Sequence, residues 1–303
     1  MPPSSDTLHS LQPQLTADGS FTFLSADFGE AFHSHHGARQ EAEQKFVVPT
    51  RLSDVARRPS LALLDICYGL GYNTAAALAT IWAVNPQCQV QWYGLELNAA
   101  VPQAAIAHHL LQAWPAPIAT QLAQLAAEQI VQSDRFTAHL LLGDARQQIQ
   151  QVYATGFRAD AIFLDPFSPP RCPQLWTVEF LAWVARCLAP AGRLATYSCS
   201  AAVRTALLQA GLHLGSSPAV GRRSPGSLAS FSPQDLPPLS RQEQEHLQTR
   251  ASIPYRDPSL TDSAATILTR RQQEQAASPL EPTSRWKARW AIPSTYSSID
   301  KIL

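Results

Sequence analysis

Short apolar runs alternate with helix-forming stretches through the middle of this chain. A short apolar run bounded by turn residues is typical of a strand buried on both faces, as in parallel sheets. This alternation predicts an α/β fold with a doubly wound, mostly parallel sheet. The apolar runs are residues 61–66, 89–96, 139–143, 161–164 and 193–197, and the helical patterns are residues 74–79, 99–132, 177–188 and 201–210.

The two ends of the chain have a different character from this middle part. Before residue 61, two strand-like runs lead into a helical stretch that begins at Gly37 and places Glu41 and Lys45 at i,i+4. Residues 221–233 are expected to supply the last antiparallel pair of strands. From residue 240 the chain is richer in Gln, Arg, Ser and Pro, with one predicted helix at 261–277.

A glycine turn follows the first of the buried strands. Gly69 and Gly71 permit positive φ and close approach of the backbone to a ligand, and Asn73 is a candidate cap for the helix that follows. The turn therefore exposes a helix N-terminus, which indicates a cradle for a nucleotide-like cofactor.

The residues around the glycines favour S-adenosylmethionine over a dinucleotide. Thr74 stands where a dinucleotide fingerprint has its third glycine, and Asp65 lies where a pyrophosphate would be repelled. The ammonium and sulfonium of S-adenosylmethionine would instead be attracted to this carboxylate. A nicotinamide dehydrogenase is therefore the least favoured interpretation.

Further acids stand at the ends of the later strands. Glu96 lies roughly 20 residues or slightly more beyond the turn, where a ribose-binding acid is expected. Asp144 is a candidate acceptor for the adenine amino group. Asp165 ends the strand at 161–164, at the edge where open α/β sheets place their chemistry. Glu41 is a further candidate to face the cofactor, although any one of these acids can also be a solvated strand-end residue.

A proline-stiffened loop follows Asp165 and contains Pro166, Pro169 and Phe167, with Trp176 beside it. Asp165 is therefore a candidate to act on a substrate, with Phe167 and Trp176 as an apolar wall beside it. The alternative is that Asp165 contacts the cofactor alone.

Composition and charge exclude several classes of protein. The 303 residues carry no net charge, with −4 in residues 1–199 and +4 in residues 200–303, so a strongly basic nucleic-acid binder is not indicated. No apolar run approaches the roughly 18 residues that span a bilayer. The first ten residues lack signal-peptide character, so a cytoplasmic location is expected.

Metal and disulfide chemistry are not indicated. The five cysteines have no paired spacing, so free thiols are expected. His33, His35 and His36 invite a metal hypothesis, but no carboxylate or cysteine stands at ligand spacing, and a polar loop is the favoured interpretation. Trp286 and Trp290, at i,i+4, either anchor the C-terminal part or stack on nucleotides, and anchoring is favoured.

The chain resembles the methyltransferase half of the bifunctional tRNA-modifying enzyme MnmC and its stand-alone relatives. The resemblance covers residues 32–212, and its most specific part is the Asp-x-Phe-x-Pro loop that runs into Leu-Trp. The matching segments are FHSHHGARQEAEQKFV, DICYGLGYNTA, GLELN, GDAR, FLDPFSPPRCPQLWTVEFLAWVARCLAPAGRLATYS and VRTALLQAGL.

The resemblance implies a Rossmann-like class I S-adenosylmethionine-dependent methyltransferase. It implies methyl transfer to the primary amine of 5-aminomethyl-2-thiouridine at the tRNA wobble position, giving 5-methylaminomethyl-2-thiouridine. The expected parts are residues 1–60 as an N-terminal cap and lid, 61–239 as the methyltransferase domain and 240–303 as a C-terminal extension. The implied site comprises Asp165 as the catalytic residue, Phe167, Pro169 and Trp176 for the substrate, and Glu41, Asp65, Gly69, Gly71, Asn73, Glu96, Asp144 and Ala145 for the cofactor.

Three departures from the family pattern bear on the acceptor. Pro166 stands where the bifunctional enzyme has glycine, no flavin-dependent oxidoreductase half is evident, and residues 240–303 lie outside the resemblance. A separate enzyme is therefore expected to supply the aminomethyl precursor. The rival interpretations are a methyltransferase of a small amine, a phenol or a protein side chain, and a non-catalytic RNA-binding scaffold.

Overall fold

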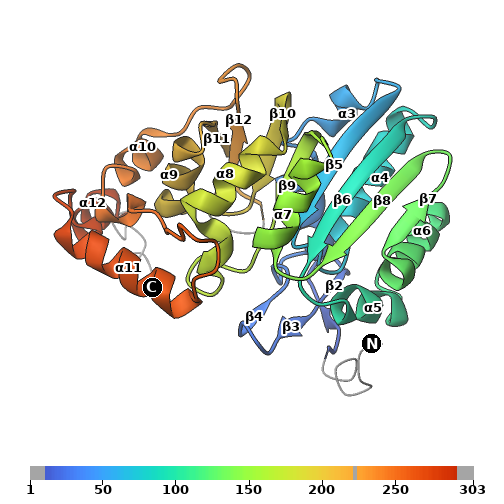
Figure 1. Ribbon diagram of the computed structural model, residues 1–303, viewed down its shortest axis with the longest axis horizontal. Helices are drawn as coiled ribbons and strands as arrows, with labels where there is room; N and C mark the ends of the chain where they lie inside the picture. Colours follow the sequence, from blue (N-terminus) through green and yellow to red (C-terminus); the bar gives the residue numbers. More distant parts are fainter. Residues whose placement is uncertain (1–10, 221–223, 292–303) are drawn as a thin grey trace, which may run out of the picture.

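The computed structural model describes residues 11–220 and 224–291 of the chain, and a single large sheet lies at its centre (Figure 1). In the order in which they pair, its strands are β11 (His213–Ser217), β12 (Gly226–Ser230), β10 (Leu188–Thr196), β9 (Ala159–Leu164), β5 (Ser60–Ile66), β6 (Gln89–Glu96), β8 (Phe136–Leu142) and β7 (Ile130–Gln132).

The middle of the sheet is parallel and its edges are antiparallel. Strands β10, β9, β5, β6 and β8 run parallel, whereas β12 is antiparallel to β10 and to β11, and β7 is antiparallel to β8. The chain leaves β5 toward β6 on one side and returns to β9 on the other. The predicted doubly wound sheet is therefore confirmed, and β5 lies at the point where the strand order reverses, next to which ligands bind in such sheets.

Helices cover both faces of the sheet (Figure 1). On one face, α4 (Tyr72–Val84), α5 (Ala100–Ala107) and α6 (Ala116–Glu128) build a hydrophobic core that includes Leu63 of β5. On the other, α7 (Ala145–Ala154), α8 (Val178–Arg186) and α9 (Ala201–Gln209) build a second core that includes Leu64. Adjacent residues of β5 thus enter opposite cores, which explains why residues 61–64 are continuously apolar.

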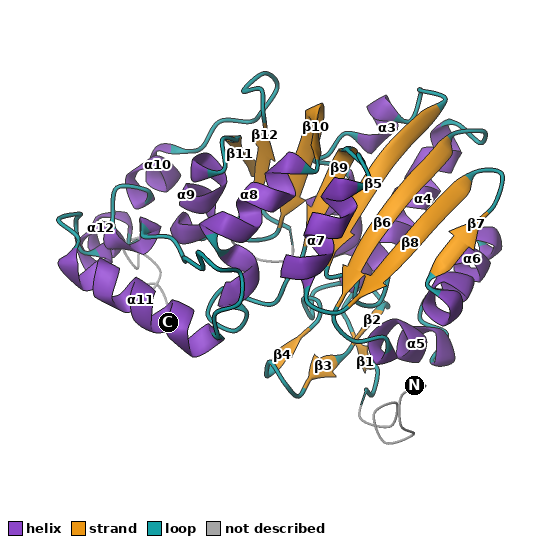
Figure 2. Cartoon of the chain, in the orientation of Figure 1, coloured by secondary structure: helices purple, strands orange, loops and turns teal. Residues whose placement is uncertain are grey.

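The N-terminal segment forms two short hairpins and a helical stretch. The hairpins pair β1 (Gln14–Leu15) with β2 (Phe21–Thr22) and β3 (Leu24–Ser25) with β4 (Glu30–Ala31). Figure 2 shows these small strands next to the arrowheads of β6 and β8, so they lie at the carboxyl ends of the parallel strands. The helical stretch comprises α2 (Ala38–Glu41), the π-helix η1 (Ala42–Val47) and α3 (Leu52–Val55).

The C-terminal segment packs beside α8 and α9, at the end of the sheet opposite β7 (Figure 1). It contains α10 (Arg241–His246), η3 (Arg250–Ser252), α11 (Ala264–Ala277) and α12 (Thr283–Trp290). In α12, Trp286 stacks on His246 with centroids 4.1 Å apart, and Trp290 donates to Glu245 Oε2 at 2.9 Å. The two indoles therefore join α12 to α10 within the C-terminal segment.

Several boundaries differ from the sequence-based expectation. The helical stretch predicted to reach residue 132 ends at Glu128, and residues 130–132 form β7, while β10 begins at Leu188 and not at residue 193. Helix α4 begins at Tyr72 with Gly71 as its N-cap, so Asn73 lies inside the helix and does not cap it. The antiparallel pair is β11 with β12, because the strand expected to begin near residue 221 finds its partner earlier, at His213–Ser217. Helix α11 begins at Ala264, where the Ser263 side chain accepts the amide of Thr266.

None of the helices in the described part of the chain combines the length and the apolar character needed to span a bilayer.

Replacement of Arg204 by alanine is expected to lower the free energy of unfolding by about 3–5 kcal/mol. The Arg204 side chain is buried and donates to Ser227 Oγ at 2.8 Å and to Glu243 Oε1 at 2.6 Å, so its loss leaves Glu243 without its cation. The matched control is Arg241→Ala, which removes an exposed pair in α10 and should change the free energy far less. Chemical denaturation measures both, and equal losses would contradict the prediction.

Candidate functional site

A cavity of about 700 Å³ lies at the carboxyl ends of β5, β6, β9 and β10. This is the size of a typical cofactor and substrate site, and it lies at the point where the strand order reverses. The N-terminal segment supplies the opposite wall, from Ser25 to Glu41. The sheet side of the wall consists of Cys67, Tyr68, Gly69, Glu96, Leu97, Asn98, Val101, Asp165, Pro166, Phe167, Ser168, Cys172, Leu175 and Tyr197.

The turn between β5 and α4 has three positive φ angles at alternate positions. They are 68° at Cys67, 58° at Gly69 and 86° at Gly71. A Cβ atom on Gly71 would lie 2.5 Å from the Tyr68 hydroxyl oxygen, so both the backbone conformation and the packing require glycine there. Gly71 thus fixes the shape of the turn through its contact with Tyr68, whereas Gly69 lines the cavity.

Glu96 closes the turn against the next strand. Its Oε2 accepts the Gly69 amide at 2.9 Å and its Oε1 accepts the Asn98 amide at 3.0 Å. Burial raises the pKa of this carboxyl, although the backbone amides oppose the shift. Leu97, the next residue, is 63% exposed and lines the cavity, which places an apolar surface beside the candidate ribose acid.

Asp65 lies beneath the turn rather than on the cavity wall. It is fully buried, and its Oδ2 accepts the Thr74 hydroxyl at 2.7 Å. Its Oδ1 is buried with no hydrogen-bond partner among the described residues. Burial raises the pKa of Asp65 to about 7. Thr74, which replaces the third glycine of a dinucleotide fingerprint, therefore orients this acid.

Asn73 and Asp165 meet at the cavity. The Asn73 amide nitrogen donates to Asp165 Oδ2 at 2.9 Å, and Asp165 lines the cavity. Within the described part of the chain, the buried Oδ1 of Asn73 has no partner. Burial raises the pKa of Asp165 well above its usual value, and the nearby charge of Glu41 adds to the effect.

Glu41 completes a group of acids at the cavity. Its Oε2 accepts the Ser34 amide at 2.8 Å, and its Oε1 lies 3.9 Å from the ammonium of the buried Lys45, so the predicted i,i+4 pair is confirmed. Lys45 lies among the four carboxyl groups of Glu41, Asp65, Glu96 and Asp165, so full ionisation of these acids would leave this region with an excess of negative charge. A cationic ligand would relieve that excess.

Three phenylalanines form the apolar part of the wall. Phe167 stacks on Phe28 with centroids 4.4 Å apart and an interplanar angle of 20°, and it meets the edge of Phe32 at 5.0 Å. The N-terminal hairpin is held to this loop because Glu30 Oε2 accepts the Ser168 amide at 3.0 Å. Phe28, Phe32 and Glu30 were not predicted, although the dense aromatic spacing of FGEAFH is a signal in the sequence.

The other predicted substrate residues do not reach the cavity. Trp176 is fully buried, and its indole nitrogen donates to the Phe167 carbonyl at 2.8 Å. It therefore supports the loop from behind and is not part of the wall, so that prediction is wrong. Pro169 is also buried and absent from the described lining residues.

Asp144 and Ala145 lie near the cavity but are not among the described residues that line it. Asp144 is the N-cap of α7, and its carboxylate is held by the Arg146 guanidinium at 2.7 Å. The structure thus brings Glu41, Gly69, Glu96, Asp165 and Phe167 together directly, and the other predicted residues lie around them.

The histidines of the N-terminal segment are not arranged as ligands. His33 is buried, and its ring stacks on Tyr72 with centroids 5.3 Å apart. Burial lowers the pKa of His33 to about 4, so the ring is neutral near neutral pH. In the described residues, no group of three His, Cys, Asp or Glu side chains could hold a metal ion.

Comparisons with known proteins agree with this geometry. A family model described as S-adenosyl-L-methionine-dependent methyltransferase matches residues 102–232. The crystal structure of MnmC2 from Aquifex aeolicus superposes with a TM-score of 0.76 at 33% identity, covering 88% of this chain and 85% of that one. The chain belongs to the MnmC-like methyltransferase family. Its fold is that of a class I S-adenosylmethionine-dependent methyltransferase, and its cofactor is S-adenosylmethionine.

Two relatives found by sequence are compared with this MnmC-like chain next. The bifunctional tRNA 5-methylaminomethyl-2-thiouridine biosynthesis protein MnmC of Ralstonia nicotianae is 31% identical over 72% of this chain and 34% of its own length. An uncharacterized protein of Methanocaldococcus jannaschii is 29% identical over 86% of this chain and 71% of its own length. The chain thus spans about a third of the bifunctional relative.

The residues of the MnmC-like site fit this cofactor. The excess negative charge suits its ammonium and sulfonium, and the buried unpartnered oxygens of Asp65 and Asn73 are acceptors that a ligand or a bound water can satisfy. Glu96 and Leu97 offer a ribose acceptor and an apolar surface. We expect Gly69 to bring the backbone close to the bound molecule.

Cofactor affinity is expected to rise with pH up to about 7. A bound cation favours the ionised form of Asp65, whose pKa burial raises to about 7, so binding below that pH must release a proton. The dissociation constant should fall up to about tenfold per pH unit below pH 7. Calorimetric titration with S-adenosylmethionine in two buffers of different ionisation enthalpy measures both the affinity and the proton.

Asp65→Asn should flatten this pH dependence. Asp134→Asn is the matched control, since Asp134 is exposed just before the amino end of β8. An affinity independent of pH in the unmodified protein, with no proton released, would show that Asp65 does not titrate on binding.

Proposed function

We propose that this chain methylates the primary amine of 5-aminomethyl-2-thiouridine at the wobble position of tRNA, giving 5-methylaminomethyl-2-thiouridine. The observation that supports this most is Asp165, which faces the cavity between the glycine turn and the wall of Phe28, Phe32 and Phe167. The name of the MnmC relative from Ralstonia nicotianae contains the same modified nucleoside. A carboxylate can bind the amine of such an acceptor, while the neighbouring aromatic rings stack on its planar base.

Asp165 acts on the acceptor amine by orientation and charge. S-adenosylmethionine supplies an activated methyl group when bound, so positioning of the amine provides most of the rate. Asn73 holds Oδ2 of Asp165, and Oδ1 accepts an N–H of the neutral amine and directs its lone pair. As positive charge develops on the nitrogen, the carboxylate stabilises it, and the proton that leaves the product amine passes to Asp165 or to solvent.

The phenylalanine wall binds the base that carries the amine. An apolar environment disfavours the ammonium form and lowers the pKa of the acceptor amine, which raises its reactive fraction. A wobble base extruded from the anticodon loop can stack on an aromatic ring here. The N-terminal segment thus acts as a lid, in line with a division into a cap of residues 1–60, a methyltransferase domain of residues 61–239 and an extension of residues 240–303.

Two further proposals concern partners. The aminomethyl precursor must be made by a chemical activity other than the methyl transfer of this fold. The arginines of α11 do not serve tRNA binding, because Arg271 donates to the carbonyls of Ile253 and Ala251 and Arg270 pairs with Asp262.

The zero net charge favours a second candidate, a methyltransferase of a small amine or a protein side chain.

Labelled S-adenosylmethionine and bulk tRNA from cells that lack the methylation step test this function. The expected result is label in 5-methylaminomethyl-2-thiouridine after nucleoside analysis. Asp165→Asn should lower kcat at least about 100-fold while the affinity for S-adenosylmethionine changes little. Cofactor binding without labelled tRNA would favour the second candidate, and a normal kcat for Asp165→Asn would reduce Asp165 to a cofactor contact.

Phe28→Ala should raise the KM for tRNA about 10- to 100-fold with little change in kcat, since base stacking contributes about 1–3 kcal/mol. Leu24→Ala is the matched control, because Leu24 lies in the same hairpin, is half exposed and is absent from the described cavity wall. Steady-state kinetics with tRNA give both constants. If the two variants behave alike, Phe28 does not stack on the base.

A further inference from the structure

Asp144 follows β8 and lies next to the end of β6, whose Glu96 lines the cofactor cavity. Glu96 and Leu142 are neighbours in the parallel pair of β6 and β8, and the Gly143 amide donates to the Glu96 carbonyl at 2.9 Å. This contact between two backbone groups fixes the position of the residue that follows Gly143. The Asp144 side chain remains one-third exposed, so a ligand bound beside Glu96 can reach it. Under the proposed function, its ligand is the adenine amino group of the cofactor.

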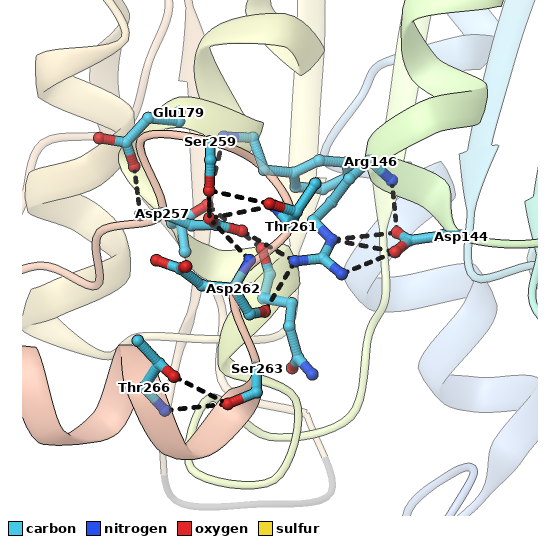
Figure 3. Close-up of polar contacts among 12 residues, drawn as sticks. Asp144, Arg146, Glu179, Asp257, Ser259, Thr261, Asp262, Ser263 and Thr266 are labelled. Atoms are coloured by element: carbon cyan, nitrogen blue, oxygen red, sulfur yellow. Dashed lines mark hydrogen bonds and ion pairs between the residues drawn. The ribbon is translucent and has the colours of Figure 1, made fainter.

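Arg146 holds the Asp144 carboxylate in a forked arrangement (Figure 3). Its Nη2 donates to Oδ2 at 2.7 Å, its Nε lies 3.1 Å from both oxygens, and its backbone amide donates to Oδ1 at 2.9 Å. Three donor groups thus contact a carboxylate that can accept about four hydrogen bonds. The Nε hydrogen is shared between both oxygens, so one of its two contacts can give way to a further donor, and the orientation of Asp144 depends on the guanidinium.

The other end of the same guanidinium is bound by the C-terminal segment. Arg146 Nη1 donates to Asp257 Oδ2 at 2.8 Å and to the Asp262 carbonyl at 3.0 Å. Asp257 is fully buried, and its Oδ1 accepts the amides of Thr261 and Asp262 at 3.2 and 3.1 Å. Figure 3 shows the guanidinium between the two carboxylates of Asp144 and Asp257.

The loop that carries Asp257 is itself fixed to α8. The Asp257 amide donates to Glu179 Oε2 at 2.8 Å, and Arg256 pairs with the other oxygen of Glu179 at 2.7 Å. One residue before Glu179, the Val178 amide donates to the Tyr255 carbonyl at 3.1 Å. Asp257 therefore presents its carboxylate to Arg146 from a rigid support.

We propose that Asp257 is a positioning residue for adenine recognition, acting through Arg146 on Asp144. By fixing Nη1, Asp257 sets the guanidinium fork and with it the direction of the remaining acceptor position of Asp144. Two carboxylates on one guanidinium also leave a net negative charge, which favours a donor such as an exocyclic amino group. This inference rests on the proposed assignment of Asp144, and it gives the C-terminal segment a part in cofactor selection.

The test compares the affinities for S-adenosylhomocysteine and S-inosylhomocysteine, in which a carbonyl replaces the 6-amino group. The unmodified protein should bind the adenosine compound about 10- to 100-fold more tightly. In the inosine compound, the carbonyl oxygen would face the Asp144 carboxylate, and neither group can donate a hydrogen bond to the other. Asp144→Ala should abolish this ratio, and Asp257→Asn should lower it at least about fivefold. Asp262→Asn is the matched control, because its side chain pairs with Arg270.

A merely structural role for Asp257 predicts a different result. Both affinities would then fall together and the ratio would stay unchanged, which would overturn the inference. If Asp257→Asn does not fold, the double variant Arg146→Met with Asp257→Leu removes the buried pair without leaving a lone charge, and it should show the same loss of ratio. An unmodified protein that binds both compounds equally would overturn the assignment of Asp144, whereas the labelling of tRNA tests the proposed function separately.

Discussion

The site depends most on one constraint: several carboxylates lie close together, with little access to water, at the carboxyl ends of the central strands. Glu41, Glu96 and Asp165 line one cavity and Asp65 lies beneath it, all with limited access to water. In so poorly hydrated a place, each charge raises the cost of ionising the next. The free site therefore holds protons that a cationic cofactor displaces, and the cost of assembling the acids is recovered when the ligand binds.

The fold explains how acids from distant parts of the sequence reach one place. In a parallel sheet every strand ends at the same edge, and the switch of direction around β5 leaves a crevice there. Packing then adjusts the details. The Tyr68 hydroxyl excludes any side chain at Gly71, Thr74 orients Asp65, and Asn73 orients Asp165, so the first turn of α4 organises two acids at once.

The sequence predicted the sheet and the glycine turn well, because each follows from a local pattern with a physical cause. Of the strand-end acids, Glu96 and Asp165 line the cavity, whereas Asp65 lies beneath it and Asp144 is not among the described lining residues. The orientation of aromatic side chains does not follow in that way. Trp176 and Phe28 are both aromatic residues in turn-rich stretches, yet Trp176 is buried behind the loop and Phe28 lies in the cavity wall. Which ring faces a ligand depends on segments that meet only in the folded protein. The same holds for Asp257, whose partner Arg146 is 111 residues away.

The central position of β5 also has a consequence for how the protein folds. Ala62 of β5 is hydrogen-bonded to Asp160 at the start of β9, and the two residues are 98 positions apart. Such pairing closes a long loop before it gains any contact energy, so it is expected to form slowly. The crevice lies at this seam, and cofactor binding competence should therefore appear late in refolding, after the β5 to β6 half has already acquired its structure.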